Sequence, residues 1–268
     1  MSDTILNTIV KDAAAELAKQ KRDRPLSSLL SMPGFARTPL SLAKSLRSDS
    51  LSVIAEIKRT SPSKGRLRDD YYVDVIARSY ASADARAISV LTEKNHFEGH
   101  LSHLVAARSA VSVPILRKDF LVDPYQLAEA RAYGADAVLL IVTLLERSHL
   151  QEMLSAASEL ELSCLVELYD ESELDRIDLD LISIVGVNNR NLHTFDVDVT
   201  RAPRILGHIP QDIIRVAESG LSTGQDLADT RRLGIDAVLI GEALISKPDP
   251  GEALALLRSE YERCMTDT

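Results

Sequence analysis

The chain has 268 residues, with 31 Lys and Arg against 40 Asp and Glu, which gives a formal net charge of −9. This acidic balance, without a stripe of basic residues, disfavours binding to a nucleic-acid backbone. The hydrophobic fraction of 45% is typical of a globular protein, the longest apolar run (137–142) is too short for a bilayer, and two cysteines form no disulfide framework. We therefore expect a cytoplasmic protein that binds neither nucleic acid nor membrane.

The first fifty residues lie outside the pattern that fills the rest of the chain. An N-terminal helix is expected, with one apolar face made by Ile5, Leu6, Ile9, Val10, Ala13 and Leu17. A Ser- and Pro-rich stretch at residues 25–39 follows, and then a short amphipathic piece through Leu42 and Leu46. We expect residues 1–50 to form a helical extension that covers either the floor or the mouth of the following fold.

From residue 51 onward, short aliphatic runs alternate with longer amphipathic stretches. Eight runs are expected to be strands, at residues 53–57, 87–91, 114–117, 137–142, 164–167, 182–187, 214–217 and 237–240. They recur about every 20 to 35 residues, as βα units do, and most are continuously apolar, which is typical of parallel strands covered on both faces. The pattern predicts a (β/α)8 TIM barrel over residues 51–264, within a single domain of residues 1–268. A doubly wound open sheet is the alternative, but the glycine-rich phosphate loop expected after its first strand is absent.

Two turns share the pattern Gly-x-Asp-Ala-Val. It occurs at residues 134–138, before the fourth strand, and at residues 234–238, before the eighth. A duplicated half-barrel would place the two turns in this way, and a general preference of such turns for Gly and Asp explains them equally well.

Charged residues stand at the carboxyl ends of the predicted strands, where barrels of this kind carry their reacting groups. Glu56 and Lys58 end the first strand on one face, Lys118 ends the third and Glu167 ends the fifth. Buried charges are costly unless they are paired or functional, so the four predict an acid–base site, with a rim of structural ion pairs as the alternative. We expect each lysine to lose its proton more easily near the other, and the lysines to keep both carboxylates ionised.

Small residues follow the last two strands, in Ser219-Gly220-Leu221-Ser222 and in Gly241-Glu242-Ala243. Barrels commonly bind a phosphate at these two turns through backbone N–H groups. We expect Gly220 and Gly241 to form such a cradle, with the hydroxyl of Ser61 directed at the same anion.

A metal site is not expected. Four side chains lie close together in sequence without the fixed spacing of metal ligands: His96, Glu98, His100 and His103. No cofactor-binding fingerprint is present either.

Taken in order, these segments resemble the indole-3-glycerol phosphate synthase family, lyases of tryptophan biosynthesis. The resemblance runs from about residue 54 to residue 245 and rests on EIKRTSPS (56–63), SVLTE (89–93), FEG (97–99), LRKDF (116–120), VE (166–167), GVNNRNL (186–192) and AESG (217–220). Related barrels of the pathway share the phosphate turns but not the loop after the first strand. Residues 5–25 also resemble the extra helix of the family.

The resemblance implies closure of 1-(2-carboxyphenylamino)-1-deoxyribulose 5-phosphate to indole-3-glycerol phosphate, with loss of CO₂ and water and without metal or cofactor. It implies that Lys118 is the general acid and that Glu167 stabilises the cationic intermediate or takes its proton. Lys58, oriented by Glu56, is then the second lysine, which contacts the substrate carboxylate or assists dehydration.

The resemblance also implies a set of binding residues. Asn188 would orient the ribulose hydroxyls and Glu167, Arg190 would complement a carboxylate or brace the site, and Ser219 would position substrate near the phosphate. Three apolar side chains match the slot for the anthranilate ring: Phe97, Phe120 and Leu139. The implied partner is a phosphorylated small molecule; a monomer is compatible with this, as is association with other tryptophan-pathway enzymes.

Two further functions are the alternatives for a barrel of this kind. A phosphoribosylanthranilate isomerase would need an acid–base pair such as Cys and Asp, whereas the first strand here offers Glu56 and Lys58. A non-catalytic phosphate-binding barrel would bind ligand without forming product, and the intact charged set argues against it.

Overall fold

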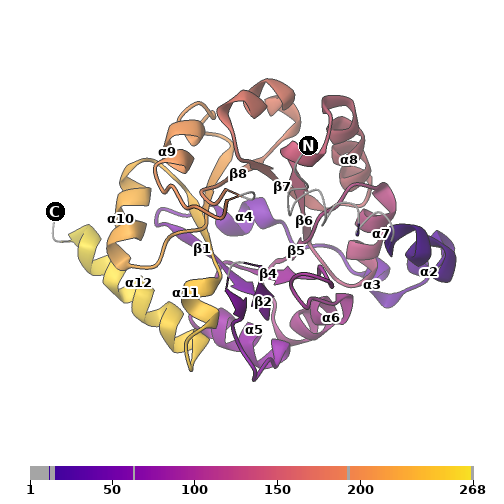
Figure 1. The fold of residues 1–268 in the computed structure, drawn as a ribbon, viewed down its shortest axis with the longest axis horizontal. Coiled ribbons are helices and arrows are strands. Elements are labelled where there is room, and N and C mark those ends of the chain that lie inside the picture. Colours follow the sequence, from indigo (N-terminus) through magenta and orange to yellow (C-terminus); the bar gives the residue numbers. More distant parts are fainter. Residues whose placement is uncertain (1–11, 13–15, 63, 192–193, 267–268) are drawn as a thin grey trace.

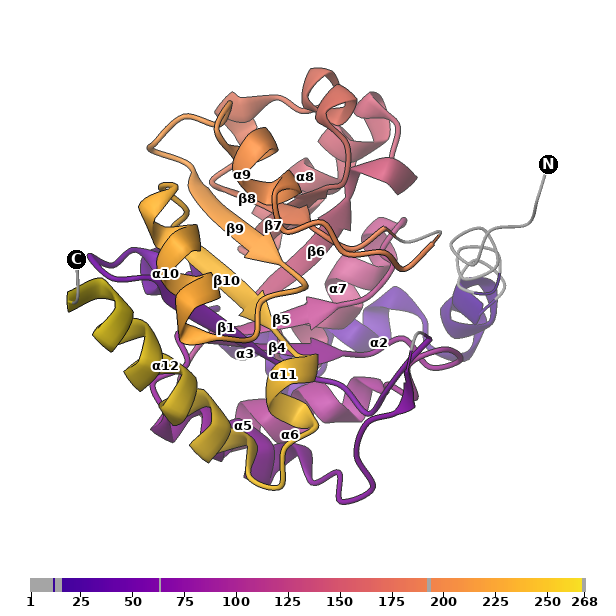
Figure 2. The same cartoon turned by 60° about the vertical axis from the view of Figure 1, so that its left-hand side comes forward.

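The computed structural model describes residues 12, 16–62, 64–191 and 194–266. Eight parallel strands close into a barrel in the order β1-β10-β9-β8-β7-β6-β5-β4, and β1 pairs with both β4 and β10. Figure 1 looks down the ring of strands, and Figure 2 shows it from the side, with helices around its outer face. The closed ring confirms the predicted TIM barrel and excludes the open sheet.

The barrel strands are β1 (Ser52–Ile57), β4 (Ala87–Leu91), β5 (Ile115–Lys118), β6 (Ala137–Ile141), β7 (Ser163–Leu168), β8 (Ile184–Asn188), β9 (Ile214–Glu218) and β10 (Ala237–Ile240). The outer helices are α5 (Val73–Ser82), α6 (Leu101–Ala110), α7 (Pro124–Ala132), α8 (Arg147–Glu159), α9 (Arg201–Leu206), α10 (Gly224–Arg232), α11 (Glu242–Ile245) and α12 (Pro250–Thr266). Short 3-10 turns are η1 (Val142–Leu144), η2 (Glu171–Arg176) and η3 (Leu179–Leu181), and a hairpin of β2 (Thr60–Ser61) and β3 (Gly65–Arg66) lies in the loop after β1. Every predicted strand overlaps an observed one, with ends that differ by at most two residues. No helix among the described residues is long and apolar enough to cross a membrane.

Side chains along each barrel strand alternate between the interior of the ring and the layer beneath the helices. On β9, Ile214 and Val216 belong to the interior cluster, whereas Ala217 packs in the outer layer. The next inward position on that strand is Glu218, which is buried at the carboxyl end. On β5 the same alternation directs Leu116 and then Lys118 into the barrel. The charged side chains therefore lie directly above the apolar interior of the barrel.

The N-terminal extension closes the floor of the barrel. It contains α2 (Leu26–Leu30), α3 (Pro33–Ala36) and α4 (Leu42–Leu46). Leu42 and Leu46 are fully buried in the interior cluster, and the Ser45 hydroxyl donates to the carbonyl of Arg86 just before β4. In Figure 1, α4 is visible through the ring of strands.

The extension also reaches the opposite end of the barrel. Asp12 lies 3.3 Å from the His96 ring nitrogen in the loop after β4, and Lys21 pairs with Asp123 at 2.6 Å in the loop after β5. Leu17, from the predicted apolar face, is buried against α7. The other residues of that face, 5, 6, 9, 10 and 13, lie outside the described residues. The extension therefore contacts both floor and mouth, which the sequence left as alternatives.

The two Gly-x-Asp turns make equivalent contacts at the amino ends of the strands. The carboxylate of Asp136 accepts the N–H of Ile115 at 2.8 Å, and that of Asp236 accepts the N–H of Arg215 at 2.9 Å. Each aspartate therefore ties the start of its own strand to the start of the preceding one. This shared bonding is a physical reason for the shared sequence of the two turns. It explains the pattern without a duplicated half-barrel.

Candidate active site

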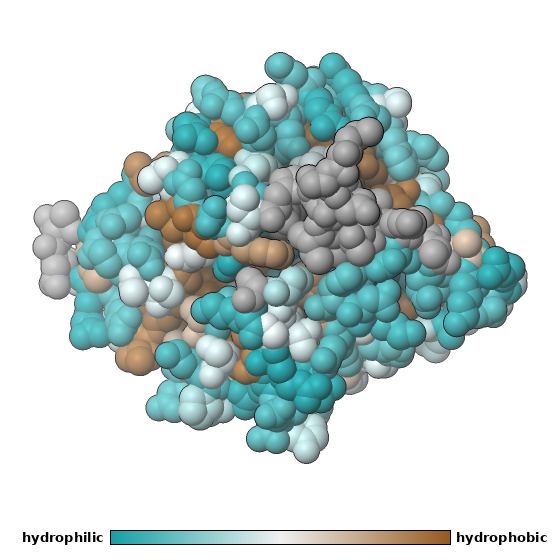
Figure 3. Space-filling view, viewed as in Figure 1, coloured by the Kyte–Doolittle hydropathy of each residue, from teal (hydrophilic) through white to brown (hydrophobic). Residues whose placement is uncertain are grey.

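A cavity at the carboxyl ends of the barrel strands is lined by all the residues nominated from the sequence. They are Glu56, Lys58, Ser61, Phe97, Lys118, Phe120, Leu139, Glu167, Asn188, Arg190, Ser219, Gly220 and Gly241. In Figure 3 most of the visible face is hydrophilic, and hydrophobic residues are visible toward its middle. Barrel closure thus brings residues that are up to 185 positions apart in the chain, Glu56 and Gly241, into one cavity.

The end of β1 supplies an ion pair to this cavity. The Lys58 ammonium lies 2.8 Å from a Glu56 carboxylate oxygen, and both side chains are mostly buried. Burial by itself raises the pKa of Glu56, but the ammonium groups of Lys58 and Lys118 outweigh it and lower that pKa. A Cβ on Gly241 would lie 2.3 Å from the Glu56 carboxylate, so the turn after β10 needs glycine in order to approach this pair.

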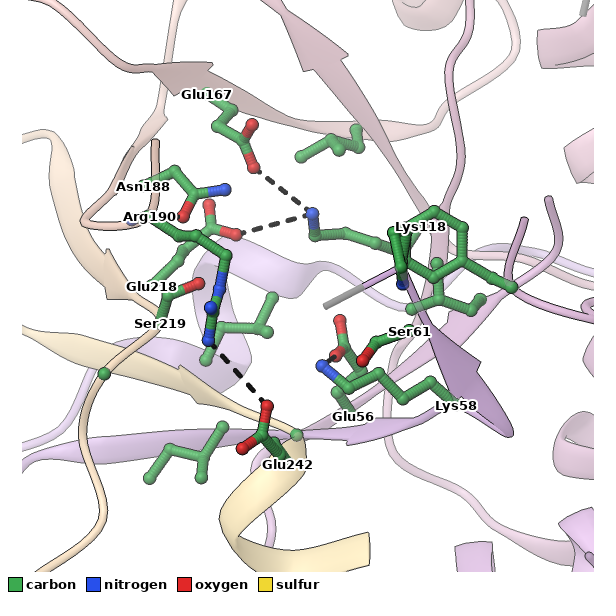
Figure 4. Close-up of a pocket in the computed structure, with 18 of the residues that line it drawn as sticks. Glu56, Lys58, Ser61, Lys118, Glu167, Asn188, Arg190, Glu218, Ser219 and Glu242 are labelled. Atoms are coloured by element: carbon green, nitrogen blue, oxygen red, sulfur yellow. Dashed lines mark hydrogen bonds and ion pairs between the residues drawn. The ribbon is translucent and has the colours of Figure 1, made fainter. Parts of the chain in front are cut away.

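Lys118, at the end of β5, lies between two carboxylates (Figure 4). Its ammonium is 3.2 Å from Glu167 on β7 and 3.7 Å from Glu218 on β9. Burial by itself lowers the pKa of Lys118, but the neighbouring carboxylates outweigh it, Glu167 most strongly and then Glu218, and raise the pKa above its ordinary value. The expectation that Lys118 loses its proton more easily near the other lysine is therefore wrong, because the neighbouring carboxylates stabilise its charged form.

Glu218 is the main residue of the cavity that was not nominated from the sequence. It is buried, and its Oε1 has no hydrogen-bond partner among the described residues. Burial, followed by the negative charge of Glu167, raises the pKa of Glu218 well above its ordinary value. Two signals could have found it: its inward position after Val216 on β9, and Gly186 on the adjacent strand, where a Cβ would lie 2.4 Å from the Glu218 carboxylate.

The turn after β9 has a backbone that few side chains tolerate. Ser219 has a φ of 67° and Gly220 a φ of 83°, both in the left-handed region. A Cβ on Gly220 would lie 2.4 Å from the side chain of Val197. Together with Gly241 and Ser61, which line the same cavity, this turn leaves main-chain atoms open to a bound anion.

Asn188 and Arg190 follow β8. The Asn188 side-chain oxygen accepts the N–H of Arg190 at 3.0 Å, which fixes the amide relative to the strand end. The Arg190 guanidinium lies 3.8 Å from Glu242, whose other oxygen is 2.5 Å from Lys64 in the loop after β1. Glu242 lines the cavity and was not nominated.

Phe195 lines the cavity, and Phe97 and Phe120 form an aromatic wall of it. Their ring centroids are 6.3 Å apart, with ring planes inclined by 35°. Leu139 on β6 and Leu239 on β10 line the same cavity. An apolar slot of this kind excludes water from a flat aromatic ligand.

The arrangement combines three chemical capacities. A protonated ammonium group stands within reach of two carboxylates, an apolar slot lies beside it, and two turns with little side-chain bulk face the same space. This combination can donate and accept protons on an anionic ligand that has an aromatic part. Within the described part of the chain, no three His, Cys, Asp or Glu side chains form a group that could hold a metal ion.

Comparison with known proteins adds to this geometry. The family profile "Indole-3-glycerol phosphate synthase" matches residues 6–257. An indole-3-glycerol phosphate synthase from Salinibacter ruber is 51% identical over 97% of each chain, and one from Dehalococcoides mccartyi is 44% identical over 91% of this chain and 96% of its own. Among solved structures, thiamine phosphate pyrophosphorylase from Pyrococcus furiosus superposes with a TM-score of 0.58 at 17% identity, covering 84% of this chain and all of that one, which supports the fold alone.

Proposed function

The chain belongs to the indole-3-glycerol phosphate synthase family, and from that premise we propose how its side chains divide the steps of the reaction. The chain is a carbon–carbon lyase of tryptophan biosynthesis. It closes 1-(2-carboxyphenylamino)-1-deoxyribulose 5-phosphate to indole-3-glycerol phosphate and releases CO₂ and water. One carbon–carbon bond forms, and the bonds to the carboxylate carbon and to the ketone oxygen break.

Lys118 is the general acid of ring closure. As the ring carbon that bears the carboxylate attacks the ketone, the ketone oxygen gains negative charge and takes a proton from the ammonium. The observation that supports this role is the position of that ammonium, 3.2 Å from Glu167 and 3.7 Å from Glu218. The Glu167 carboxylate keeps the amine protonated before substrate binds and stabilises the positive charge that develops in the substrate ring.

Decarboxylation follows because loss of CO₂ restores the aromatic ring, so the step needs neither metal nor organic cofactor. The hydroxyl group formed from the ketone oxygen then leaves as water. A proton leaves the neighbouring ring carbon, which is bonded both to the nitrogen and to the carbon that carried this hydroxyl. Lys58, held by Glu56 at 2.8 Å, is placed to protonate the departing hydroxyl. Glu167 is the base that removes the carbon-bound proton.

Binding is divided between two ends of the cavity. We assign the phosphate to Ser61, Gly220 and Gly241, with Ser219 beside it. The carboxyphenyl ring is assigned to the slot of Phe97, Phe120 and Leu139. Asn188 orients the ribulose hydroxyls, and Arg190 complements the substrate carboxylate. A phosphorylated substrate does not cross a bilayer unaided, which favours a cytoplasmic location.

The test uses the absence of tryptophan from the chain. Excitation at the red edge of protein absorption gives little background, so indole formation is visible directly. We expect indole fluorescence to grow when the carboxyphenylamino deoxyribulose phosphate is added to protein treated with a chelator. A flat trace from folded protein would remove the proposed assignment of roles.

A further inference from the structure

Both phenylalanines of the aromatic wall stand on loops, where no hydrogen bonds between barrel strands hold the backbone in place. Phe97 lies between β4 and α6, and Phe120 between β5 and α7. Loops change conformation more easily than strands, so rings held 6.3 Å apart need support from elsewhere. Two buried carboxylates, those of Glu93 and Asp119, supply it.

Glu93 holds the Phe97 loop through its backbone. Glu93 as a whole is only 7% exposed, and its carboxylate accepts three successive main-chain N–H groups, those of Asn95 at 3.0 Å, His96 at 2.7 Å and Phe97 at 3.1 Å. Its own carbonyl accepts the N–H of Gly99 at 2.7 Å. The loop therefore wraps around one side chain, and the backbone of Phe97 is bonded to it directly.

Asp119 does the same for Phe120. One carboxylate oxygen accepts the Phe120 N–H at 2.9 Å, and the other accepts the Thr92 hydroxyl at 2.5 Å and the Arg117 guanidinium at 3.0 Å. Thr92 directly precedes Glu93 in the chain. The supports of the two rings are thus neighbours at the ends of β4 and β5, because Asp119 is bonded to Thr92 and Glu93 follows Thr92 in the chain.

We propose that Glu93 and Asp119 are positioning residues that set recognition of the aromatic half of the substrate. The proposal rests on the proposed function, because it takes the slot between Phe97 and Phe120 as the site of the carboxyphenyl ring. A carboxylate is suited to this task because it accepts hydrogen bonds at both oxygens. An amide in its place would turn one acceptor into a donor that faces backbone donors, and the loop would have to shift.

The test is Glu93→Gln, which keeps the size of the side chain and removes part of its accepting capacity. We expect KM for the full substrate to rise about 3- to 10-fold, the effect of one weakened aromatic contact, while kcat changes less. The inhibition constant of 2-aminobenzoate, which resembles the aromatic half, should rise by a similar factor. The inhibition constant of inorganic phosphate should stay unchanged.

Asp136→Asn is the matched control. Asp136 is a fully buried carboxylate that accepts the main-chain N–H groups of Leu40 and Ile115, but it lies at the opposite end of the barrel. We expect it to lower the unfolding midpoint and to leave both inhibition constants as in the wild type. If Glu93→Gln does not fold, Asp119→Asn repeats the test on the residue that holds the backbone of Phe120.

The outcomes separate the proposal from its premise. An unchanged KM and an unchanged 2-aminobenzoate constant in the Glu93 variant would overturn the positioning role. So would an equal weakening of phosphate binding, because that would indicate general disruption of the cavity. A wild-type protein that forms no indole-3-glycerol phosphate would instead overturn the proposed function.

Discussion

The two ends of the barrel both carry buried carboxylates beside cations, yet the two sets differ in how completely they are bonded. At the amino end, Asp136 accepts two main-chain N–H groups and pairs with Arg37 and Arg108, each at 2.7 Å. At the carboxyl end, Glu218 keeps one oxygen without a partner among the described residues, and its pKa is raised by burial.

The difference separates stability from reactivity. Removing a buried carboxylate whose oxygens are all bonded leaves its partners unpaired and is strongly destabilising, and such a carboxylate has no capacity left for a ligand. Carboxylates that face a cavity with incomplete bonding cost stability, but they are available to move protons. Variants at the two ends should therefore have opposite effects on rate and on stability.

The largest effect is expected from Lys118→Met. Without an ammonium group between Glu167 and Glu218, the ketone oxygen has no proton donor, so kcat should fall by about 10²- to 10⁴-fold. Steady-state indole fluorescence measures the rate, and thermal unfolding monitors the fold. A rate within threefold of the wild type would contradict the role of Lys118.

At the other end, Asp136→Asn should act on stability alone. The change leaves Arg37 and Arg108 without a full counter-charge at a site that is 0% exposed, which should cost about 3 kcal/mol in the free energy of unfolding. Urea denaturation measures it, and kcat of the folded fraction should be unchanged. A tenfold loss of kcat with wild-type stability would break the contrast between the two ends.

Glu218→Gln tests the raised pKa through the pH dependence of stability. The ordinary glutamate pKa is 4.5, and in the folded protein it is raised. As pH rises past 4.5, the unfolded chain releases this proton while the folded chain retains it, so this carboxyl makes the wild type less stable at higher pH.

The glutamine variant lacks that titration. Its free energy of unfolding relative to the wild type should therefore increase between pH 4.5 and pH 8, by about 1.4 kcal/mol for each tenfold difference in proton affinity between the two states. Urea denaturation of both proteins across this range gives the difference. Parallel curves would show that Glu218 is ionised in the folded protein.

The smallest effect is expected from Asp236→Asn. Asp236 occupies the same position as Asp136 in the second Gly-x-Asp turn, but its side chain is 26% exposed and its ion pairs, 3.3 Å to Arg215 and 3.6 Å to Arg231, are longer. We expect a loss of about 1 kcal/mol, smaller than for Asp136→Asn. Equal losses in the two variants would mean that burial does not set the contribution of these turns.

Much of the candidate site could be predicted from the sequence because strands alternate with a period of two. That period identified Glu56 and Lys58 as a same-face pair, and the structure has them 2.8 Å apart. Glu218 was not predicted although the same rule applies to it, because the small residues Ser219 and Gly220 that directly follow it carry the more obvious pattern, that of a phosphate-binding turn. Glu93 and Asp119 lie within segments that carry the family resemblance, but their role could not be predicted, because it depends on main-chain bonds within loops.

The sequence by itself determined the barrel, its strands and the chemical types at their ends, because local periodicity and apolar content specify these. Only the tertiary structure decided what the charges do to one another. The sequence indicated two lysines that lower each other's pKa. Closure of the ring instead places Glu167 and Glu218 beside Lys118, and the pKa of Lys118 is raised. Electrostatic effects depend on distances between strands that are remote in the chain, and those distances exist only once the barrel has closed.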